Sequence, residues 1–316
     1  MSLIEISSQQ LVMSEIRGKV MSNIGFVLLT HGHPEQALRL MNTLNKVYNF
    51  PPIAWHHDFS KSEFPVNRCT SNVEFVNPHV KTSWGTYSLV EAKLKALKLL
   101  YRSETPSFYS TLSGADYPIK QAHTVLKDLE TANCDVHIRH ALIDYQHLSK
   151  TWHHQYYKRY CSINLLIKRT NKQGLKVVSQ LPLIKHPALT KYFTPFNKNI
   201  KCWGGEFWYT GSKKSAQFIL DHVAEDPYGL VKHYRKVKIP DESLFQTIFK
   251  NSDSLICSND SKRYIDWSAG QPHPKTLTLN DYTKILESNA HFARKFDTSE
   301  SSICLLDKVD SLILGI

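Results

Sequence analysis

The sequence predicts an α/β fold with a central sheet flanked by helices, and three observations carry that prediction. Short apolar segments with β-branched residues, such as Ile24–Thr30 and Phe108–Leu112, are typical of buried strands. Segments with apolar residues at helical spacing alternate with them, as in Glu35–Val47 and Ser88–Leu100. Polar clusters stand directly after the strands, and sites in such sheets lie at the carboxyl ends of strands.

The polar clusters follow three predicted strands. The first strand ends at His31–Pro34, and a second short strand, Ile53–Trp55, ends at His56, His57 and Asp58. The loop Ser113–Pro118 follows the strand Phe108–Leu112. The carboxyl ends of parallel strands share one edge of a sheet, so these loops are the first candidates for a binding site.

The second half of the chain has a weaker pattern. Tyr145–Arg169 is basic and aromatic without a clean period, and we expect an irregular insert beside the site. Gly204–Gly211 is strand-like and is followed by a predicted helix through Ala224. Asp241 is the expected N-cap of the helix that continues through Phe249. Two more short elements are expected, a strand at Arg263–Trp267 and a helix at Asp281–Glu287.

Size and composition favour one large domain. The chain has 316 residues, of which 41% are hydrophobic and 21% charged, with no linker and no repeat. Residues 1–20 mix charges with small polar residues and are expected to be an extension, neither signal peptide nor membrane span, before a single domain at 21–316. No apolar run reaches about 18 residues, so we expect a cytoplasmic protein.

Charge and cysteine content limit the partners. The net charge of +11 and pI near 9.2 favour an anionic partner, which is a nucleic acid, an anionic membrane surface or a phosphate-bearing substrate. The six cysteines lie far apart, without the close pairs of a zinc site or a disulfide framework. We expect them to be reduced and structural.

Several motifs occur together in one order. They are TSWG at 82–85, LSGADYPIK at 112–120, GGEFWYTGS at 204–212, PDESLFQT at 240–247, RYIDW at 263–267, HPKTLTLNDY at 273–282 and HFARKFD at 291–297. In these motifs the sequence resembles the core-2/I-branching N-acetylglucosaminyltransferase and xylosyltransferase family, glycosyltransferase family 14, from about Ile24 to the end. Its closing stretch looks most like the plant and bacterial branches of that family. The resemblance implies a GT-A nucleotide-sugar fold with a mixed sheet, a UDP-sugar donor, inversion at the anomeric carbon, and no metal or other cofactor.

The diphosphate leaving group needs positive charge. Many GT-A enzymes hold a divalent cation with an Asp-x-Asp pair, and this chain contains no Asp-x-Asp. Lys275 and Lys295 match the two basic positions that contact the diphosphate in the related family, and Arg294 is a weaker candidate. Cations placed where charge develops in the transition state are strongly catalytic. The structural alternative is that these are ordinary solvated lysines on a basic chain.

Inverting transfer also needs a carboxylate that removes the proton of the attacking hydroxyl. Glu242 matches the position of the family's catalytic base. The alternative is local, because a Glu in the first turn of a helix is stabilised by the helix dipole wherever it occurs. Only the resemblance favours the catalytic interpretation.

Donor and acceptor contacts are also suggested by the resemblance. Asp58 matches the position that contacts uridine, and His31 is expected near the same pocket. Asp116 stands where other GT-A enzymes carry the metal motif, and contact with the donor sugar and the capping of a turn are equally compatible with it. Trp84 is expected to pack beside the donor pocket rather than to bind directly.

For the acceptor we select Glu206 and Trp208, because sugar rings present C–H faces to aromatic rings and hydroxyls to carboxylates. Alternation on one strand would place both on one side. The alternative for Trp208 is a core position. Many members of the family carry a small residue near Glu206, and this departure leaves the role of Glu206 open.

Other functions have weaker support in the sequence. The cluster His31, His33, His56, His57 and Asp58 invites a metal site, but adjacent histidines on one strand point to opposite faces. Single-stranded nucleic-acid binding would use the basic and aromatic segment, yet no nucleic-acid motif supports it. The remaining rivals keep the fold, as a hydrolase of nucleotide sugars or a non-catalytic member.

The expected partners are a UDP-sugar donor and a saccharide, glycolipid or peptide acceptor, without nucleic acid. Peripheral contact with an anionic membrane is compatible with the basic charge. The sequence leaves the donor sugar open among GlcNAc, xylose and glucuronic acid.

Overall fold

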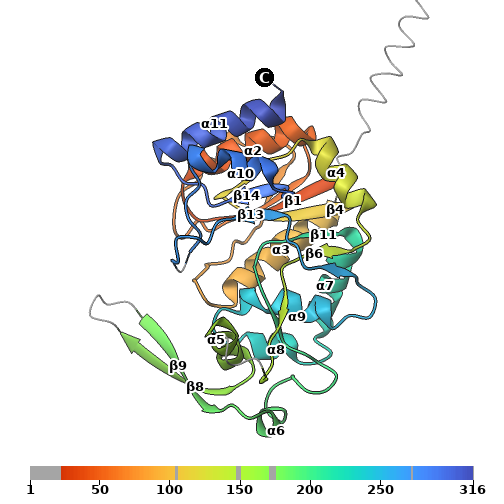
Figure 1. The fold of residues 1–316 in the computed structure, drawn as a ribbon, viewed down its shortest axis with the longest axis vertical. Helices are drawn as coiled ribbons and strands as arrows, with labels where there is room; N and C mark the ends of the chain where they lie inside the picture. Colours follow the sequence, from red (N-terminus) through yellow and green to blue (C-terminus); the bar gives the residue numbers. More distant parts are fainter. Residues whose placement is uncertain (1–22, 104–105, 147–150, 171–175, 272, 316) are drawn as a thin grey trace, which may run out of the picture.

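A seven-stranded mixed sheet forms the centre of the protein in the computed structural model, which describes residues 23–103, 106–146, 151–170, 176–271 and 273–315 (Figure 1). The strand order is β12-β6-β11-β4-β1-β2-β3. The strands are β1 Ile24–Thr30, β2 Ile53–His57, β3 Val73–Phe75, β4 Phe108–Ser113, β6 Val136–His137, β11 Thr210–Ser212 and β12 Cys257–Ser258.

The first four of these strands in chain order run parallel to one another, and β11 runs antiparallel to both β4 and β6. Every residue of β1 is buried, as its continuous apolar run predicts. Thr30 of β1 pairs with His57 of β2, and Leu29 pairs with Ser113 of β4. The carboxyl ends of β1, β2 and β4 therefore meet at one edge of the sheet.

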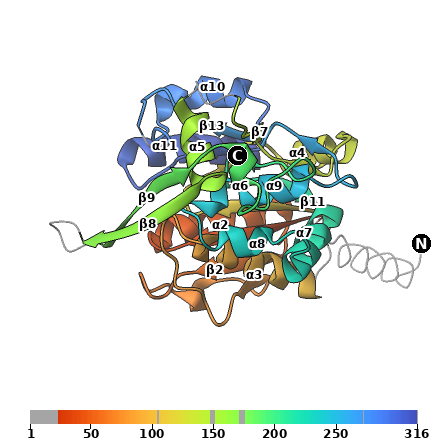
Figure 2. The ribbon, with the colours of Figure 1, turned by 90° about the horizontal axis from the view of Figure 1, so that it is seen from below.

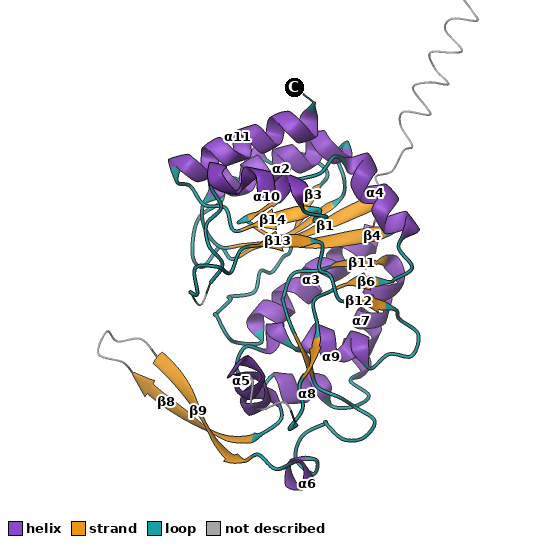
Figure 3. Cartoon of the chain, viewed as in Figure 1, coloured by secondary structure: helices purple, strands orange, loops and turns teal. Residues whose placement is uncertain are grey.

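Helices cover both faces of this sheet (Figure 3). Alternate residues of β1 enter two cores: Phe26 and Leu28 pack in one core, and Val27 and Leu29 pack in the other. The helices are α2 Pro34–Tyr48, α3 Ser88–Ser103, α4 Ala122–Thr131, α7 Lys213–Glu225, α8 Leu230–Tyr234, α9 Leu244–Lys250, α10 Tyr282–Glu287 and α11 Glu300–Leu314. The predicted α/β fold is confirmed, and its mixed sheet is consistent with the GT-A type.

A second sheet brings the end of the chain next to the loop after β4. It has the order β13-β14-β5, with β5 at Asp116–Pro118, β13 at Arg263–Ile265 and β14 at Phe292–Arg294. Arg294 pairs with Asp116 across β14 and β5. Two short helices complete this half, η1 at Val66–Arg68 and η3 at Leu279–Asp281.

The prediction of an irregular insert at Tyr145–Arg169 is wrong. The segment forms α5, Thr151–Tyr160, and then β8, Ile163–Thr170, which pairs antiparallel with β9, Lys176–Ile184. The short helix α6, Pro187–Thr190, follows. The sequence does not predict α5 because its buried side chains, Tyr157 and Tyr160, are aromatic and do not form an aliphatic stripe at helical spacing.

The prediction of one strand over Gly204–Gly211 is also wrong. Trp203–Gly204 form β10, paired with β7 at Ala141–Leu142, and the chain then leaves the extended ladder until Thr210. A physical cause lies at Gly205, where a Cβ would stand 2.0 Å from the carbonyl oxygen of Arg139. Glu206 and Trp208 therefore do not alternate on one strand.

Asp241 is not the N-cap of a helix. Pro240–Glu242 form a separate 3-10 turn, η2, in which the Ser243 amide donates to the Pro240 carbonyl at 3.2 Å. The following helix α9 begins at Leu244, after Ser243. Asp241 is buried inside the turn, which places Glu242 at the end of the turn.

Two further expectations concern residues 1–20 and the absence of a membrane-spanning segment. Residues 1–20, the expected extension, lie outside the described residues. No helix in the described part of the chain has the length and apolar character needed to span a bilayer.

Buried histidines make the fold sensitive to acid. Burial lowers the pKa of His56, His233 and His291 to about 4. Between pH 7 and pH 5 the unfolded chain takes up protons on these groups and the folded protein does not, so stability present above pH 6.5 is lost as the pH falls towards 4. Burial, with the neighbouring Glu242 charge, raises the pKa of Asp241 to about 7, which offsets part of this loss.

We expect the free energy of unfolding to fall by roughly 3 kcal/mol between pH 7 and pH 5, since each histidine contributes a loss of about 2 kcal/mol and Asp241 a gain of similar size. Urea unfolding at the two pH values measures this difference. An equal or larger free energy at pH 5 would contradict the buried neutral state of these histidines.

Candidate active site

The predicted donor loops meet at the carboxyl edge of the sheet. His31 follows β1 and is exposed, and Asp58 follows β2. Gly114, in the loop after β4, comes so close to β1 that a Cβ there would stand 3.2 Å from Thr30 Cγ2. The structure therefore brings the three loops together, as expected for parallel strands.

Asp58 is fully buried and its carboxylate is saturated with hydrogen bonds. Oδ2 accepts from the Thr82 amide at 2.7 Å and the Thr82 hydroxyl at 2.6 Å, while Oδ1 accepts from the Ser60 amide at 3.1 Å and the Ser60 hydroxyl at 2.6 Å. Burial raises the pKa of Asp58, and these hydrogen bonds outweigh it and hold the pKa well below its usual range. The arrangement fixes the loop that carries Trp84 and leaves Asp58 little capacity to bind uridine directly.

Trp84 does not pack, and that expectation is wrong. Its side chain is 72% exposed, whereas Tyr87 and Val90, further along the same segment, are buried in the core. The Lys238 ammonium lies 5.6 Å from the centre of the Trp84 ring. The neighbouring Gly85 carbonyl accepts a hydrogen bond from the Ile239 amide at 2.9 Å, which joins the donor loop to the turn of Glu242.

Glu242 is a half-exposed carboxylate held by α5. The Tyr156 hydroxyl donates to Oε2 at 2.8 Å, and the Arg159 guanidinium lies 3.2 Å from the same oxygen. Burial, with the adjacent Glu242 charge, raises the pKa of Tyr156, so the phenol remains a donor. Within the described residues no group donates to Oε1. This geometry fixes the carboxylate through Oε2 and leaves Oε1 open to the proton of an acceptor hydroxyl.

Two glycines make this arrangement possible. A Cβ at Gly204 would stand 2.4 Å from the Tyr156 ring, and Gly205 is confined by the Arg139 carbonyl. The Gly205 amide donates to the Glu242 carbonyl at 2.8 Å. The GG pair therefore packs the segment 204–208 against both the turn of Glu242 and the helix that orients it.

The predicted acceptor residues follow this glycine pair. Glu206 Oε2 accepts from the Ser261 hydroxyl at 3.0 Å, and burial raises the pKa of Glu206. Trp208 is half-buried, and the Arg294 guanidinium lies 5.2 Å from the centre of its ring. Trp208 thus has contacts with the core and with a predicted diphosphate residue.

Asp116 caps the turn after β4. Its Oδ2 accepts from the Ser113 amide at 2.6 Å and from the Ser113 hydroxyl. Oδ1 is buried without a hydrogen bond from the described residues and lies 3.8 Å from Arg294 Nε. The turn-capping alternative is therefore realised, and Oδ1 together with Arg294 forms a charged pair beside Trp208.

The two predicted lysines lie on neighbouring segments but differ in their partners. The Leu277 amide donates to the Lys295 carbonyl at 2.9 Å, which joins the segments. The Lys275 ammonium is 2.8 Å and 3.1 Å from the two carboxylate oxygens of Asp281 and 3.7 Å from Asp266. Lys295 is half-buried and forms no ion pair with the described residues. Lys275 is thus held between two carboxylates, whereas Lys295 makes no such close pair in the described part of the chain, although it is near enough to Asp297 to help lower the pKa of that carboxyl.

The sequence interpretation missed a buried lysine at the centre of the site. Lys93 of α3 is fully buried, donates to the Phe207 carbonyl and to Thr111 Oγ1, and lies 3.4 Å from the centre of the Phe207 ring. Burial lowers its pKa well below the ordinary value. Lys93 lies at helical spacing from Val90 and Leu97, and this spacing indicates from the sequence alone that it belongs to the apolar face of the helix.

Arg263, in the motif RYIDW, is a second buried cation that the sequence does not single out. Its buried guanidinium donates to Ser110, Thr111, Tyr209 and Thr210, and so ties β13 to the central sheet. Burial lowers its pKa to about 10. Tyr156 and Arg159 had no local signal, because only the fold brings α5 to Glu242.

The paired histidines have structural contacts. The Val80 amide donates to His56 Nε2 at 2.9 Å, while His57 Nδ1 lies 2.8 Å from Thr30 Oγ1 and Nε2 lies 3.0 Å from the Ser62 carbonyl. The two rings therefore bond to different segments, as opposite faces of a strand require. Among the described residues, no group of three or more His, Cys, Asp or Glu side chains is placed to hold a metal ion.

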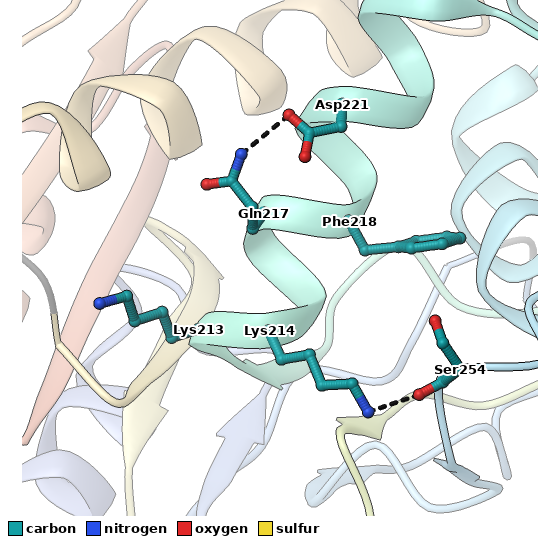
Figure 4. A pocket seen from close by; sticks show the side chains of 6 residues that line it. All are labelled: Lys213, Lys214, Gln217, Phe218, Asp221 and Ser254. Carbon is teal, nitrogen blue, oxygen red and sulfur yellow. Dashed lines mark hydrogen bonds between the residues drawn. The ribbon is translucent and has the colours of Figure 1, made fainter.

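A surface pocket elsewhere carries no site. It lies along α7, and Figure 4 shows its lining residues, Lys213, Lys214, Gln217, Phe218, Asp221 and Ser254. Lys214 donates to the Ser254 carbonyl, and Gln217 donates to Asp221 at 2.8 Å. The polar groups of this pocket are largely satisfied, and it contains none of the predicted residues.

A mixed sheet with helices on both faces, and with polar loops gathered at the carboxyl ends of its parallel strands, is consistent with the GT-A-like class of fold. The chain belongs to the core-2/I-branching enzyme family, whose model, described as "Branch: Core-2/I-Branching enzyme", matches residues 24–288. The resemblance found in the sequence motifs is thereby confirmed for residues 24–288, and the motif HFARKFD at 291–297 lies beyond the matched residues.

Two curated proteins of Arabidopsis thaliana are similar to it. Beta-glucuronosyltransferase GlcAT14B is 26% identical over 243 residues, which cover 74% of this chain and 51% of the relative. Beta-glucuronosyltransferase GlcAT14A is 26% identical over 251 residues, which cover 76% of this chain and 52% of the relative. The chain thus spans about half the length of these curated relatives.

Proposed function

We propose that this protein is an inverting glycosyltransferase that moves a sugar from a UDP-sugar to a hydroxyl of a saccharide, glycolipid or peptide acceptor. Membership of the core-2/I-branching enzyme family and the names of its relatives support transfer of a sugar. The observation that carries the proposal is the carboxylate of Glu242, fixed at one oxygen by Tyr156 and Arg159 and open at the other.

In the proposed reaction the acceptor oxygen attacks the anomeric carbon of the donor sugar. The bond from that carbon to the phosphate oxygen breaks and UDP leaves, while the acceptor proton passes to Glu242 Oε1. A single displacement of this kind inverts the anomeric carbon and leaves no covalent intermediate on the enzyme.

The leaving diphosphate is proposed to be neutralised by Lys295, with Arg294 and Lys275 as secondary contacts. Lys295 has an unpaired ammonium within the described residues, whereas Arg294 faces Asp116 and Lys275 is held by Asp281. Positive side chains and the lack of any Asp-x-Asp sequence together support a mechanism without metal.

For the donor sugar we propose glucuronic acid as the first candidate, with GlcNAc and xylose as alternatives. The names of both Arabidopsis relatives favour it. His31 and Asp116 Oδ1 are proposed donor contacts. Glu206 and Trp208 are proposed acceptor contacts, and Asp58 is proposed to act by fixing the loop of Trp84.

The test is a calorimetric titration of UDP in EDTA, repeated with manganese. We expect UDP to bind equally well in both, because the lysine charge needs no metal partner. Binding that disappears in EDTA and returns with manganese would contradict the metal-free mechanism. GDP serves as the control for recognition of the base, and we expect it to bind more weakly.

A further inference from the structure

The positive charge of the protein lies in one stretch of the chain. Residues 145–205 contain no Asp or Glu, and they contain eleven basic residues. The other 255 residues hold 28 basic and 28 acidic side chains. The basic segment, as we call residues 145–205, therefore accounts for the whole net charge of +11. A block of one sign on a balanced protein is typical of a surface that meets an anionic partner.

Part of the basic segment projects from the molecule. It contains α5, the β8–β9 hairpin and α6, and Figures 1 and 2 show the hairpin extending from the body beyond α5. The hairpin pairs in register from Asn164 opposite Pro182 to Thr170 opposite Lys176. An extended arm of this kind can reach a surface without disturbing the sheet or the site.

Apolar side chains are exposed on the same segment. Leu165 stands opposite Leu181 in the hairpin register, and Leu183 lies two residues further along, at the irregularity between Pro182 and Ile184. They are 49%, 51% and 61% exposed. Tyr192 and Phe193, after α6, are 72% and 69% exposed. Aliphatic side chains grouped in this way mark a binding surface rather than ordinary scatter.

Exposed lysines accompany these apolar residues. Lys185 directly follows β9, and Lys191 stands between α6 and Tyr192. Apolar side chains that enter the headgroup region, flanked by lysines that meet anionic headgroups, are the combination that holds peripheral proteins on bilayers. We propose that the basic segment docks on the surface of an anionic lipid bilayer, with Leu181, Leu183, Tyr192 and Phe193 entering the interface.

Two other partners fit the same surface less well. A second copy of the chain would bring two segments of like charge together, and like charges repel. A nucleic acid would use the lysines and aromatic rings, but it offers no apolar environment to a stripe of leucines. The bilayer matches both features at once. This proposal does not depend on transferase activity.

Flotation of the full chain with vesicles tests the proposal. We expect binding to vesicles of phosphatidylcholine mixed with phosphatidylglycerol, and little binding to pure phosphatidylcholine. The double variant Lys185→Gln/Lys191→Gln should lower the partition coefficient by roughly 30-fold, because each lysine near an anionic surface contributes about a five-fold increase. Leu181→Ser/Leu183→Ser should lower it by about 10-fold or more.

Matched controls carry the same changes elsewhere. Lys46→Gln/Lys98→Gln removes the same charge from exposed positions outside the segment, and Ile303→Ser/Leu312→Ser removes exposed apolar side chains from α11. Both controls should bind vesicles within about two-fold of the parent protein, since their side chains lie outside the proposed contact. An unchanged thermal midpoint shows that each variant is folded.

Three results would overturn the proposal. The first is equal binding to neutral and anionic vesicles, and the second is equal loss in the segment variants and their controls. The third is that the parent protein does not bind vesicles at all. In that case the leucine change would instead abolish its binding to single-stranded RNA or its self-association in sedimentation. That last result would assign the basic segment to a nucleic acid or to a second copy.

Discussion

Lys295→Ala is expected to weaken UDP binding by roughly 10- to 100-fold, which corresponds to the loss of a charge-assisted hydrogen bond. The ammonium of Lys295 forms no ion pair with the described residues, so its charge is available to a diphosphate. Lys275 differs, since Asp281 and Asp266 already neutralise it. Calorimetric titration of UDP into the folded variant measures the change.

Two comparison variants separate the role of Lys295 from general charge. Lys284→Ala removes an exposed lysine of α10, and UDP affinity should stay within about two-fold of the parent, because a solvated surface charge has little effect. Lys275→Ala leaves the buried Asp281 carboxylate without its cation, so we expect the thermal midpoint to fall. If Lys295→Ala binds UDP as tightly as the parent protein, Lys295 has no part in diphosphate binding.

Glu242→Gln is expected to lower the rate of sugar transfer by roughly 100-fold or more, because an amide keeps the shape of the carboxylate but cannot accept the acceptor's proton. Tyr156 can still donate to the amide oxygen, and the side chain at position 242 is half-exposed in its 3-10 turn. Stability should therefore change by only about 1 kcal/mol or less. The rate is measured with saturating donor and acceptor.

Glu225→Gln is the matched control for this change. Glu225 is an exposed carboxylate at the end of α7, and its replacement should leave transfer unchanged. Transfer near the parent rate in Glu242→Gln would mean that Glu242 only stabilises the packing of its 3-10 turn against α5. The role of base would then pass to Glu206, whose pKa burial raises.

Much of the fold could be predicted because its strongest elements have short-range patterns. The buried strand Ile24–Thr30 coincides with β1, and the predicted helix at 35–47 differs from α2 by one residue at each end. Their apolar periodicity is a local property, and burial follows from it directly. The meeting of His31, Asp58 and the loop after β4 then follows from the parallel order of three strands.

The parts that failed depend on contacts between distant segments. Gly205 leaves the strand because the Arg139 carbonyl occupies the space of a Cβ, and nothing near Gly205 in the sequence records this contact. Asp58 is saturated by Thr82, and Lys275 is paired with Asp281, through distances set by the fold. Residue type therefore indicated candidate sites, but the availability of each charge required the structure.

One paired measurement tests the central claim that Glu242 is the base of a UDP-sugar transferase. The same preparation of Glu242→Gln is titrated with UDP and then assayed for a single turnover of transfer. We expect UDP affinity to stay within about three-fold of the parent protein while the single-turnover rate falls by roughly 100-fold or more. A near-normal rate with normal UDP affinity would contradict it.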